Sequence, residues 1–456
     1  LEGVCYILDE PTIGLHPRDN RMLLGTLDKL QGNGNTIIVV EHDEETILHA
    51  DHIIDIGPGA GVRGGEIVAQ GTVDEIRRTP GSATGHLLDH PLEHPLQPIR
   101  KKGDETLLIT GAAMHNLRNV EVEIPLRRLV CVSGVSGSGK STLVRSVLHD
   151  SLRGLNAQQK KARANRRPGA PVGCTSITGW RSIDRLLEVD QTPIGKTSRS
   201  CPATYIGFWD NIRRLFADTT EARIRGYEPG RFSFNTAGGR CEECEGQGMQ
   251  RIEMSFLPDV KVPCEACGGQ RFDTETLSVR WKERSIGEVL LMNIDDAVPF
   301  FESHPSIHHP LTLLQDVGLG YLTLGQGSAT LSGGEAQRIK LVTELSKAKP
   351  AMTDTRGRTV VGTHTLYILD EPSVGLHMAD VENLIKVLHR LVDAGNSVIL
   401  IEHNLDLMAE ADWLVDMGPE GGAGGGRVMA KGPPKRVAAS KRSVTAPFLR
   451  EMLGGG

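Results

Sequence analysis

A glycine-rich loop between a strand and a helix constrains this fold more than any other feature of the sequence. Residues 134–141 read Gly-Val-Ser-Gly-Ser-Gly-Lys-Ser, after the apolar run 129–133 and before the helical stretch 142–148. Glycines in this setting let backbone N–H groups converge on phosphate oxygens at the start of a helix. The sequence therefore predicts a phosphate-binding loop on a largely parallel α/β sheet.

The side chains of this loop are expected to bind ATP and Mg²⁺. Lys140 would reach the β- and γ-phosphates, and the Ser141 hydroxyl would ligate Mg²⁺. The strand before the loop and the helix after it favour this interpretation over a chance match. The predicted nucleotide-binding residues of the loop are Gly134, Ser136, Gly137, Ser138, Gly139, Lys140, Ser141 and Thr142.

Two stretches of the chain repeat at a constant offset of 361 residues. Residues 6–16 (YILDEPTIGLH) match 367–377 (YILDEPSVGLH), and 37–42 (IIVVEH) match 398–403 (VILIEH). Several separate motifs share one offset without a gap, so chance is a poor explanation. Each copy is expected to form a βαβ unit whose first strand is buried and apolar on both faces.

The acidic end of each repeated strand carries residue types that ATP hydrolysis needs. Asp370 would hold Mg²⁺, and Glu371 would orient or deprotonate the attacking water. His403 ends the next strand and would contact the γ-phosphate. A lone histidine after a strand is more often structural, but His42 repeats it in register and favours function. Glu10 is the counterpart of Glu371 in the first copy.

Two further motifs follow in the order typical of ABC-type ATPases. Gln191 lies about 50 residues after the loop, where a glutamine is expected to sense Mg²⁺ and the attacking water. Residues 331–335 read Leu-Ser-Gly-Gly-Glu, an ABC signature that precedes a helix from Ala336 to about Ser346. Such a short glycine motif is weak alone and gains its meaning from its position. Its predicted nucleotide contacts are Ser332, Gly333 and Gly334.

Two Cys-x-x-Cys pairs predict a zinc site between the loop and the signature. Cys241 and Cys244 are separated from Cys264 and Cys267 by 19 residues. This spacing suits a tetrahedral Cys₄ zinc site, which is closed and structural. Four unpaired buried thiols or a redox dithiol are the alternatives. Because only 8 cysteines occur in 456 residues, a disulfide scaffold is excluded and a reducing compartment is expected.

The region around these cysteines is basic, although the whole chain carries a net charge of −6. Residues 151–240 contain 16 Lys/Arg and 7 Asp/Glu, a local net charge of +9, with the densest run at 158–167. Arginines interleaved with aromatic residues suit a surface for a nucleic-acid backbone. A solvated charged face is the alternative. The chain has no apolar run of 18 residues, so no membrane span is expected.

Longer runs resemble the UvrA family, the damage-recognition ATPases of bacterial nucleotide excision repair. The matching runs are 189–205 (VDQTPIGKTSRSCPATY), 225–235 (RGYEPGRFSFN), 238–244 (GGRCEEC), 254–260 (MSFLPDV), 330–338 (TLSGGEAQR) and 369–377 (LDEPSVGLH). The resemblance covers nearly the whole chain, from the end of a first cassette through all of a second.

This resemblance implies a cytoplasmic, dimeric ABC ATPase that uses ATP, Mg²⁺ and Zn²⁺, binds distorted duplex DNA and loads UvrB. In the family the zinc-bearing insert contacts the DNA backbone. Lys196 and Arg199 fall in the matching stretch, and Arg213 and Arg214 extend the predicted DNA-binding set. The UvrB-binding region is expected upstream of residue 1, since the chain is interpreted as N-terminally incomplete.

The expected fold class is α/β, an ABC-type P-loop cassette with a mixed, largely parallel sheet and a zinc-containing α+β insert. The predicted domains are 1–95, the end of the first cassette; 96–150, the start of the second; 151–325, the insert; and 326–456, the remainder of the second cassette. ABC cassettes sandwich ATP between one loop and the other cassette's signature, so this chain would hold half of each composite site. A UvrA-like drug self-resistance ATPase, or an ATP- and DNA-binding module without independent hydrolysis, are the alternatives.

Overall fold

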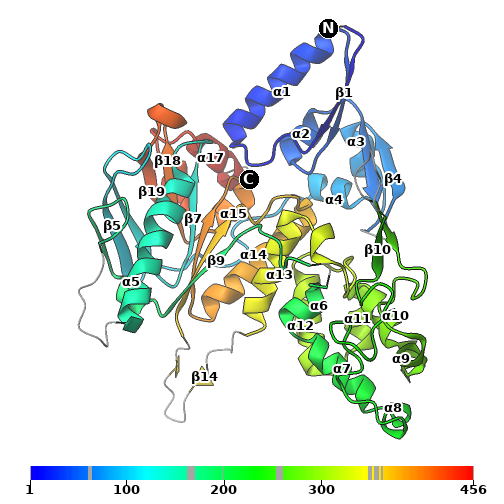
Figure 1. The fold of residues 1–456 in the computed structure, drawn as a ribbon. Helices are drawn as coiled ribbons and strands as arrows, with labels where there is room; N and C mark the ends of the chain where they lie inside the picture. The colour runs from blue at the N-terminus through cyan, green and yellow to red at the C-terminus, as the bar shows by residue number, and fades with distance from the viewer. Residues whose placement is uncertain are drawn as a thin grey trace. The chain divides into compact units, whose positions relative to one another are not determined.

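The chain folds into two compact units (Figure 1). The structure is a computed structural model and describes residues 2–59, 64–161, 170–197, 199–252, 260–347, 352–353, 359–360 and 363–454. Unit 1 comprises residues 1–58, 64–190 and 348–456, and unit 2 comprises 59–63 and 191–347. The predicted boundaries at 95, 150 and 325 stay predictions. The basic run 158–167 lies largely outside the described residues.

A six-stranded sheet forms the centre of unit 1 (Figure 1). Its neighbouring strands are parallel except for the edge pair β18 and β19, which is antiparallel. The predicted mixed, largely parallel sheet is therefore confirmed. The strand order is β19 (Arg427–Gly432), β18 (Trp413–Gly418), β7 (Leu129–Gly134), β17 (Ser397–Ile401), β16 (Thr365–Asp370) and β9 (Arg185–Val189).

A second layer and flanking helices enclose the core of this sheet. The three-stranded sheet of β6 (Val120–Pro125), β5 (Thr106–Ala112) and β8 (Ser176–Thr178) packs into the same hydrophobic cluster as β7, β16 and β17. β8 and β9 come from the segment that we predicted as part of the insert. The helices of this part are η2 (Thr142–His149), α5 (Asp150–Lys161), η3 (Trp180–Ser182), α14 (Met378–Asp393), α15 (Leu405–Glu410), η5 (Gly422–Gly424), α16 (Pro434–Ala438) and α17 (Ala446–Gly454); the short strands β14 (Met352–Thr353) and β15 (Thr359–Val360) form a separate pair.

The first repeat forms the expected parallel strands but not the expected buried ones. β1 (Cys5–Asp9) pairs in parallel with β2 (Thr36–Val40), and β3 (Ile53–Gly57) pairs antiparallel with β4 (Glu66–Gly71). Exposed and half-buried residues alternate along β1 and β2. The prediction that this strand is buried on both faces is wrong, because the two-stranded sheet has one covered face. The helices of the repeat are α1 (Pro17–Gly32), α2 (Glu44–His49), α3 (Val73–Arg78) and α4 (Ala83–Asp89).

Unit 2 carries the signature and the cysteines on short elements. The cysteine pairs flank an antiparallel hairpin of β10 (Met249–Ile252) and β11 (Val260–Pro263). The remaining elements are α6 (Pro202–Ile206), α7 (Trp209–Ala217), α8 (Thr220–Ile224), α9 (Thr274–Ser278), β12 (Arg280–Trp281), β13 (Arg284–Ser285), α10 (Ile286–Leu291), α11 (Ile294–Phe300), α12 (Pro305–Asp316), η4 (Ser328–Thr330) and α13 (Gly333–Leu345). Among the described residues, no helix combines the length and apolarity that a bilayer crossing requires.

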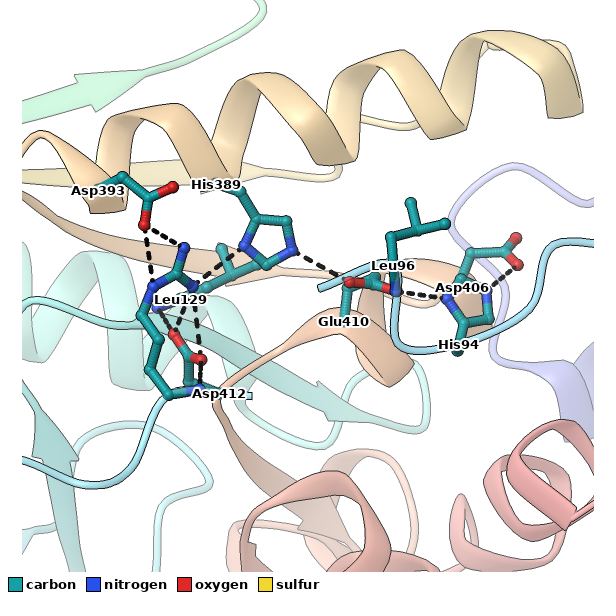
Figure 2. A network of polar contacts seen from close by, with 9 residues as sticks. His94, Leu96, Leu129, His389, Asp393, Asp406, Glu410 and Asp412 are labelled. Atoms are coloured by element: carbon teal, nitrogen blue, oxygen red, sulfur yellow. Dashed lines mark hydrogen bonds and ion pairs between the residues drawn. The ribbon is translucent and has the colours of Figure 1, made fainter. Parts of the chain in front are cut away.

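A polar network fixes the segment after the first repeat onto the helix that follows His403 (Figure 2). The two ring nitrogens of His94 lie 2.6 Å from Glu410 Oε1 and 2.9 Å from Asp406 Oδ1. Both nitrogens must donate, so the ring is doubly protonated. Burial opposes this charge, but the two carboxylates outweigh burial and raise the pKa of His94 to about 9. His389 donates to the other oxygen of Glu410, at 3.0 Å.

Equivalent positions of the two repeats differ in burial, so the same substitution at both positions measures the free energy that burial contributes. Ile7 and Ile368 occupy equivalent positions, yet Ile7 is 73% exposed and Ile368 is 1% exposed. We expect Ile368→Ala to lower the free energy of unfolding by about 2–5 kcal/mol, and Ile7→Ala by less than about 0.5 kcal/mol. Urea unfolding of the two variants measures the difference. Equal losses would contradict the exposed environment of β1.

The His94 network predicts a pH-dependent stability. A folded-state pKa of about 9 means that the stabilisation by His94 is complete below its unfolded pKa, near 6.5, and is lost as pH rises through 9. The free energy of unfolding of the unaltered chain should therefore fall by roughly 2 kcal/mol between pH 6.5 and 9, and His94→Gln should abolish this fall. Urea titrations across this range measure the slope, and His90→Gln, at an exposed neighbour, is the control. An unchanged slope in His94→Gln would refute the assignment.

Candidate nucleotide site

The phosphate-binding loop follows the central strand β7 and turns sharply into η2. Gly134, at φ +129°, touches β18 so closely that a Cβ would lie 2.0 Å from Met417 O. Gly137 and Gly139 also have positive φ, at +71° and +104°. These positions require glycine, because only glycine adopts such backbone angles without strain and allows the close approach. The loop therefore lies at the carboxyl end of a parallel strand, as predicted.

Lys140 lies folded against its own loop. Its Nζ donates to Gly134 O at 2.9 Å and to Val135 O at 3.1 Å. Burial lowers the pKa of Lys140 to about 8, and nearby carboxylates, Glu371 first, oppose that shift. The Ser138 hydroxyl is buried and has no hydrogen-bond partner within the described part of the chain. A buried donor without a partner is costly unless a ligand satisfies it, so Ser138 fits a phosphate oxygen.

The other loop residues lie where a ligand could reach them. Ser136 and Ser141 are exposed, and Thr142 begins η2. The Ser136 hydroxyl donates to Gly14 O of the first repeat, at 3.1 Å. The first repeat therefore contacts the loop of the second cassette directly.

Asp370 and Glu371 end strand β16 beside the loop. Arg145 from η2 donates to Asp370 Oδ2 at 3.2 Å and also pairs with Glu188. Sequence reasoning missed Arg145, which occupies one oxygen of the predicted Mg²⁺ ligand. Burial raises the pKa of Glu371 to about 7, and the neighbouring carboxylates of Glu402 and Asp370 add to the rise. A carboxyl group with this pKa can accept a proton near neutral pH.

Both acidic motifs hold their glutamate in a left-handed backbone conformation. Glu371 has φ +46° and Glu10 has φ +42°. A glutamate in this region costs roughly 1 kcal/mol or more, and such strain concentrates at functional sites. The two copies therefore share a backbone feature that packing alone does not explain.

A histidine faces the glutamate at the same distance in each copy. His403 Nε2 lies 3.7 Å from Glu371 Oε1, and His42 Nε2 lies 3.7 Å from Glu10 Oε1. Burial, with Lys140 and His16 nearby, lowers the pKa of His403 to about 2, so its ring is neutral. The predicted catalytic pairs are thus close together in both copies.

A glutamate before each histidine, buried in the second copy and half-buried in the first, braces the site, and sequence reasoning did not assign it a role. Glu402 accepts backbone N–H groups from Ser373 at 3.0 Å and from His403 at 2.8 Å. Glu41 repeats this pattern with Thr12 at 2.9 Å and His42 at 3.1 Å. The repeated Glu-His dipeptide was the signal that could have identified these residues.

A cleft of about 1170 Å³ in unit 1 is lined by both copies of these motifs. Glu10 and His42 line it from the first repeat, and Glu371 and His403 from the second. The two predicted catalytic pairs therefore face one space.

Within unit 2, the signature begins helix α13. Ser332 caps the helix, with Glu335 N donating to its hydroxyl at 3.2 Å and Glu335 Oε2 accepting from Ser332 N at 2.6 Å. Gln191 lies beside the motif, since a Cβ on Gly333 would lie 3.1 Å from Gln191 Cβ. Gln191 and the signature residues Ser332, Gly333 and Gly334 are thus neighbours, and their roles stay predictions.

The four cysteines form one buried cluster with their sulfur atoms within 4.8 Å of one another. Sγ of Cys241 lies 3.9 Å from Cys264, and Sγ of Cys244 lies 3.8 Å from Cys267. A tetrahedron with Zn–S bonds of about 2.3 Å has edges of about 3.8 Å. The donor set and its dimensions therefore fit zinc, and the four thiolates would close the coordination shell.

The predicted DNA-binding residues lie in unit 2 and differ in their contacts. Lys196 and Arg214 are exposed. Arg199 donates to Glu245 O at 2.8 Å, and Arg213 pairs with Asp210 on its own helix. Arg199 also pairs with the Glu245 carboxylate at 3.3 Å, so a phosphate would compete with the Glu245 and Asp210 carboxylates for these two arginines.

Comparisons with known proteins agree with this architecture. No protein-family model matches the chain. UvrABC system protein A of Thermus thermophilus is 54% identical over 450 residues, which are 98% of this chain and 45% of that protein. The protein of the same name from Mycobacterium tuberculosis is 54% identical over 461 residues, covering 100% and 45% respectively. The crystal structure of UvrA2 from Deinococcus radiodurans superposes with a TM-score of 0.85 at 45% identity, covering 99% of this chain and 52% of that one.

The chain spans about half the length of the curated relatives that it matches. The matches extend over both repeats, the loop, the signature and the cysteine pairs, because they cover nearly all of the chain. They support the predicted ABC-type α/β cassette and the predicted resemblance. Over nearly its whole length, the chain is similar to about half of UvrABC system protein A.

Proposed function

We propose that this chain binds ATP and damaged duplex DNA as part of a UvrA-type damage-recognition ATPase of nucleotide excision repair. The observation that carries the proposal is the convergence of Lys140, Glu371 and His403 at the ends of adjacent parallel strands. Ligands of open α/β sheets bind at this edge. The high identity to UvrABC system protein A supports the same function.

The proposed roles follow the chemistry of phosphoryl transfer. The loop 134–142 holds the phosphates, and Ser141 and Asp370 hold Mg²⁺. Glu371 orients or deprotonates the attacking water, His403 contacts the γ-phosphate, and Gln191 senses Mg²⁺ and the attacking water. Glu10 and His42 would do the same for the first cassette. A raised pKa and a strained backbone at Glu371 support its role as the base.

The proposed partners follow from the family. Duplex DNA binds the basic surface of unit 2, a second copy of the chain completes a homodimer, and UvrB binds through the complete protein. Because ABC cassettes hydrolyse ATP between a loop and a partner signature, hydrolysis is proposed for the assembled protein rather than for one chain. The bacterial cytoplasm, where the chromosome lies, is the proposed compartment.

Zinc is the proposed metal of the cysteine cluster. The four cysteines would hold it in a closed shell, so the metal would stabilise the fold rather than take part in chemistry. The backbone N–H of Gly248 donates to Cys244 Sγ at 3.3 Å, a bond that supports a thiolate. The cluster would fix the base of the β10–β11 hairpin.

DNA binding by the chain should depend steeply on salt. We expect the affinity for duplex DNA with a bulky lesion to fall by at least tenfold between 50 and 200 mM salt, because bound cations are released from phosphates. Lys196→Ala and Arg214→Ala should each reduce the slope of log K against log salt by about 0.9 per lost phosphate contact. Fluorescence anisotropy measures these slopes, and Lys435→Ala, at an exposed cation of unit 1, is the control.

Two outcomes would count against the proposal. Weak binding that does not change with salt would exclude a phosphate-binding surface. Equal slopes for Lys196→Ala, Arg214→Ala and the control would place the DNA elsewhere on the chain.

Zinc removal should destabilise unit 2. We expect one zinc per chain by elemental analysis, and Cys244→Ser should lose it with a drop of several degrees in the melting temperature. Cys174→Ser, at a half-buried single cysteine, is the matched control and should keep the metal. A full zinc content in Cys244→Ser would contradict the assignment.

A further inference from the structure

The repeated motif of each copy ends in a histidine that reaches into the other copy. His16 ends residues 6–16, and His377 ends residues 367–377. His16 Nδ1 accepts the backbone N–H of Arg18 at 3.1 Å, and His377 Nδ1 accepts that of Ala379 at 3.3 Å. Since Nδ1 is an acceptor in both neutral rings, the proton of each ring lies on Nε2.

The Nε2 proton of His16 begins a buried chain of hydrogen bonds in the second cassette. His16 Nε2 lies 2.9 Å from Thr445 Oγ1, whose hydroxyl donates to Asp416 Oδ1 at 2.6 Å. Ser133, just before the phosphate-binding loop, donates to the same carboxylate oxygen at 2.9 Å. His16, Ser133, Asp416 and Thr445 are each at most 1% exposed. Because each donor in this buried network has one defined acceptor, the hydrogen bonds hold these side chains in one arrangement.

The same bonds occur in reverse, with the histidine, the threonine and the aspartate each shifted by 361 residues. His377 Nε2 lies 3.1 Å from Thr84 Oγ1, and Thr84 donates to Asp55 Oδ1 at 2.9 Å. Ser82 also donates to Asp55, at 2.6 Å. The histidine of each copy therefore hydrogen-bonds to a threonine of the other copy. Random packing would not produce two such exchanges at equivalent positions.

His16 and His377, the histidines exchanged between the copies, also contact the histidine of the other copy that is proposed to contact a γ-phosphate. The rings of His16 and His403 meet edge to face, with centroids 6.2 Å apart, and those of His377 and His42 do the same at 6.4 Å. Within the described part of the chain, His403 Nδ1 has no hydrogen-bond partner. Contact with the fixed ring of His16 therefore limits the orientation of His403.

The segment that carries His16 touches two other parts of the same site. Gly14 accepts the Ser136 hydroxyl through its carbonyl oxygen, and a Cβ on Gly14 would lie 3.1 Å from Glu371 Oε2. The loop and the glutamate of the second cassette thus lie against Gly14, and its histidine lies against His16.

We propose that His16 is a positioning residue for the triphosphate at the loop 134–141, and that His377 has the reciprocal role toward His42. Thr445 and Asp416 fix the His16 ring, and the ring holds His403 where it contacts a γ-phosphate. This inference rests on the proposed ATP binding and adds that one repeat supplies selectivity for triphosphate over diphosphate to the other. ADP lacks the γ-phosphate that His403 is proposed to contact, so the loss of His16 should affect ATP and spare ADP.

Nucleotide binding by the whole chain tests this role. Kd values for ATPγS and for ADP, each with Mg²⁺, are measured by isothermal titration calorimetry. His16→Ala and Thr445→Val should weaken ATPγS binding by about tenfold, or about 1.4 kcal/mol, and change ADP binding by less than twofold. Thr445→Val keeps the shape of the side chain, so it also serves if His16→Ala does not fold.

Thr84→Val is the matched control, because it makes the same chemical change at the equivalent position of the other network. It should leave both Kd values at the loop 134–141 unchanged. An equal effect of Thr84→Val and Thr445→Val on ATPγS, or an equal loss of ATPγS and ADP binding in Thr445→Val, would overturn the proposed role.

Lys140→Ala separates this inference from the proposed function. If the unaltered chain binds neither nucleotide better than Lys140→Ala does, ATP binding itself is refuted. If the unaltered chain binds both nucleotides and Thr445→Val keeps the same ratio of Kd values, only the positioning role of His16 is refuted.

Discussion

Parallel pairing of β7, β17 and β16 is the constraint on which the site depends. Parallel strands point the same way, so their carboxyl ends meet at one edge of the sheet. β7 delivers the phosphate-binding loop to that edge, β17 delivers His403, and β16 delivers Glu371. No loop needs to reach across the molecule to assemble these groups. The grouping of the loop, Glu371 and His403 is therefore a consequence of strand direction.

Similar apolar patterns have different environments in the two repeats. Ile38 and Ile399 occupy equivalent positions in two apolar strands, yet Ile38 is 49% exposed and Ile399 is fully buried. Apolar periodicity predicted the strands and their direction correctly, because these depend on local sequence. It predicted the burial of β1 wrongly, because burial depends on which strands and helices lie alongside. β17 has β7 and β16 as neighbours, and β2 has β1 alone.

The loop and the cysteine cluster could be predicted because their chemistry is encoded in short spacings. The structure places the four cysteines of two Cys-x-x-Cys pairs together, as the spacing indicated. Arg145, Glu402 and Asp416 were missed because each acts through a residue distant in the sequence. The repeat at an offset of 361 residues carried a signal for Glu402 and Asp416, since it continues past the recognised motifs to Ser82-Ala-Thr84 and Ser443-Val-Thr445. Arg145 has no counterpart at this offset.

Strain and burial at Glu371, the proposed catalytic base, show that this arrangement costs the fold stability. Glu371 combines a left-handed backbone with a buried carboxyl group whose pKa is raised, and both features cost stability. The surrounding bonds compensate, because Glu402 accepts the backbone N–H groups of Ser373 and Asn404 and the exchanged histidines join the repeats. Glu10 has the same left-handed backbone, so the strain is common to the repeated Asp-Glu motif of both copies. A strained, partly protonated glutamate is held in place by groups from both repeats, so disturbance of one repeat changes the chemistry available to the other.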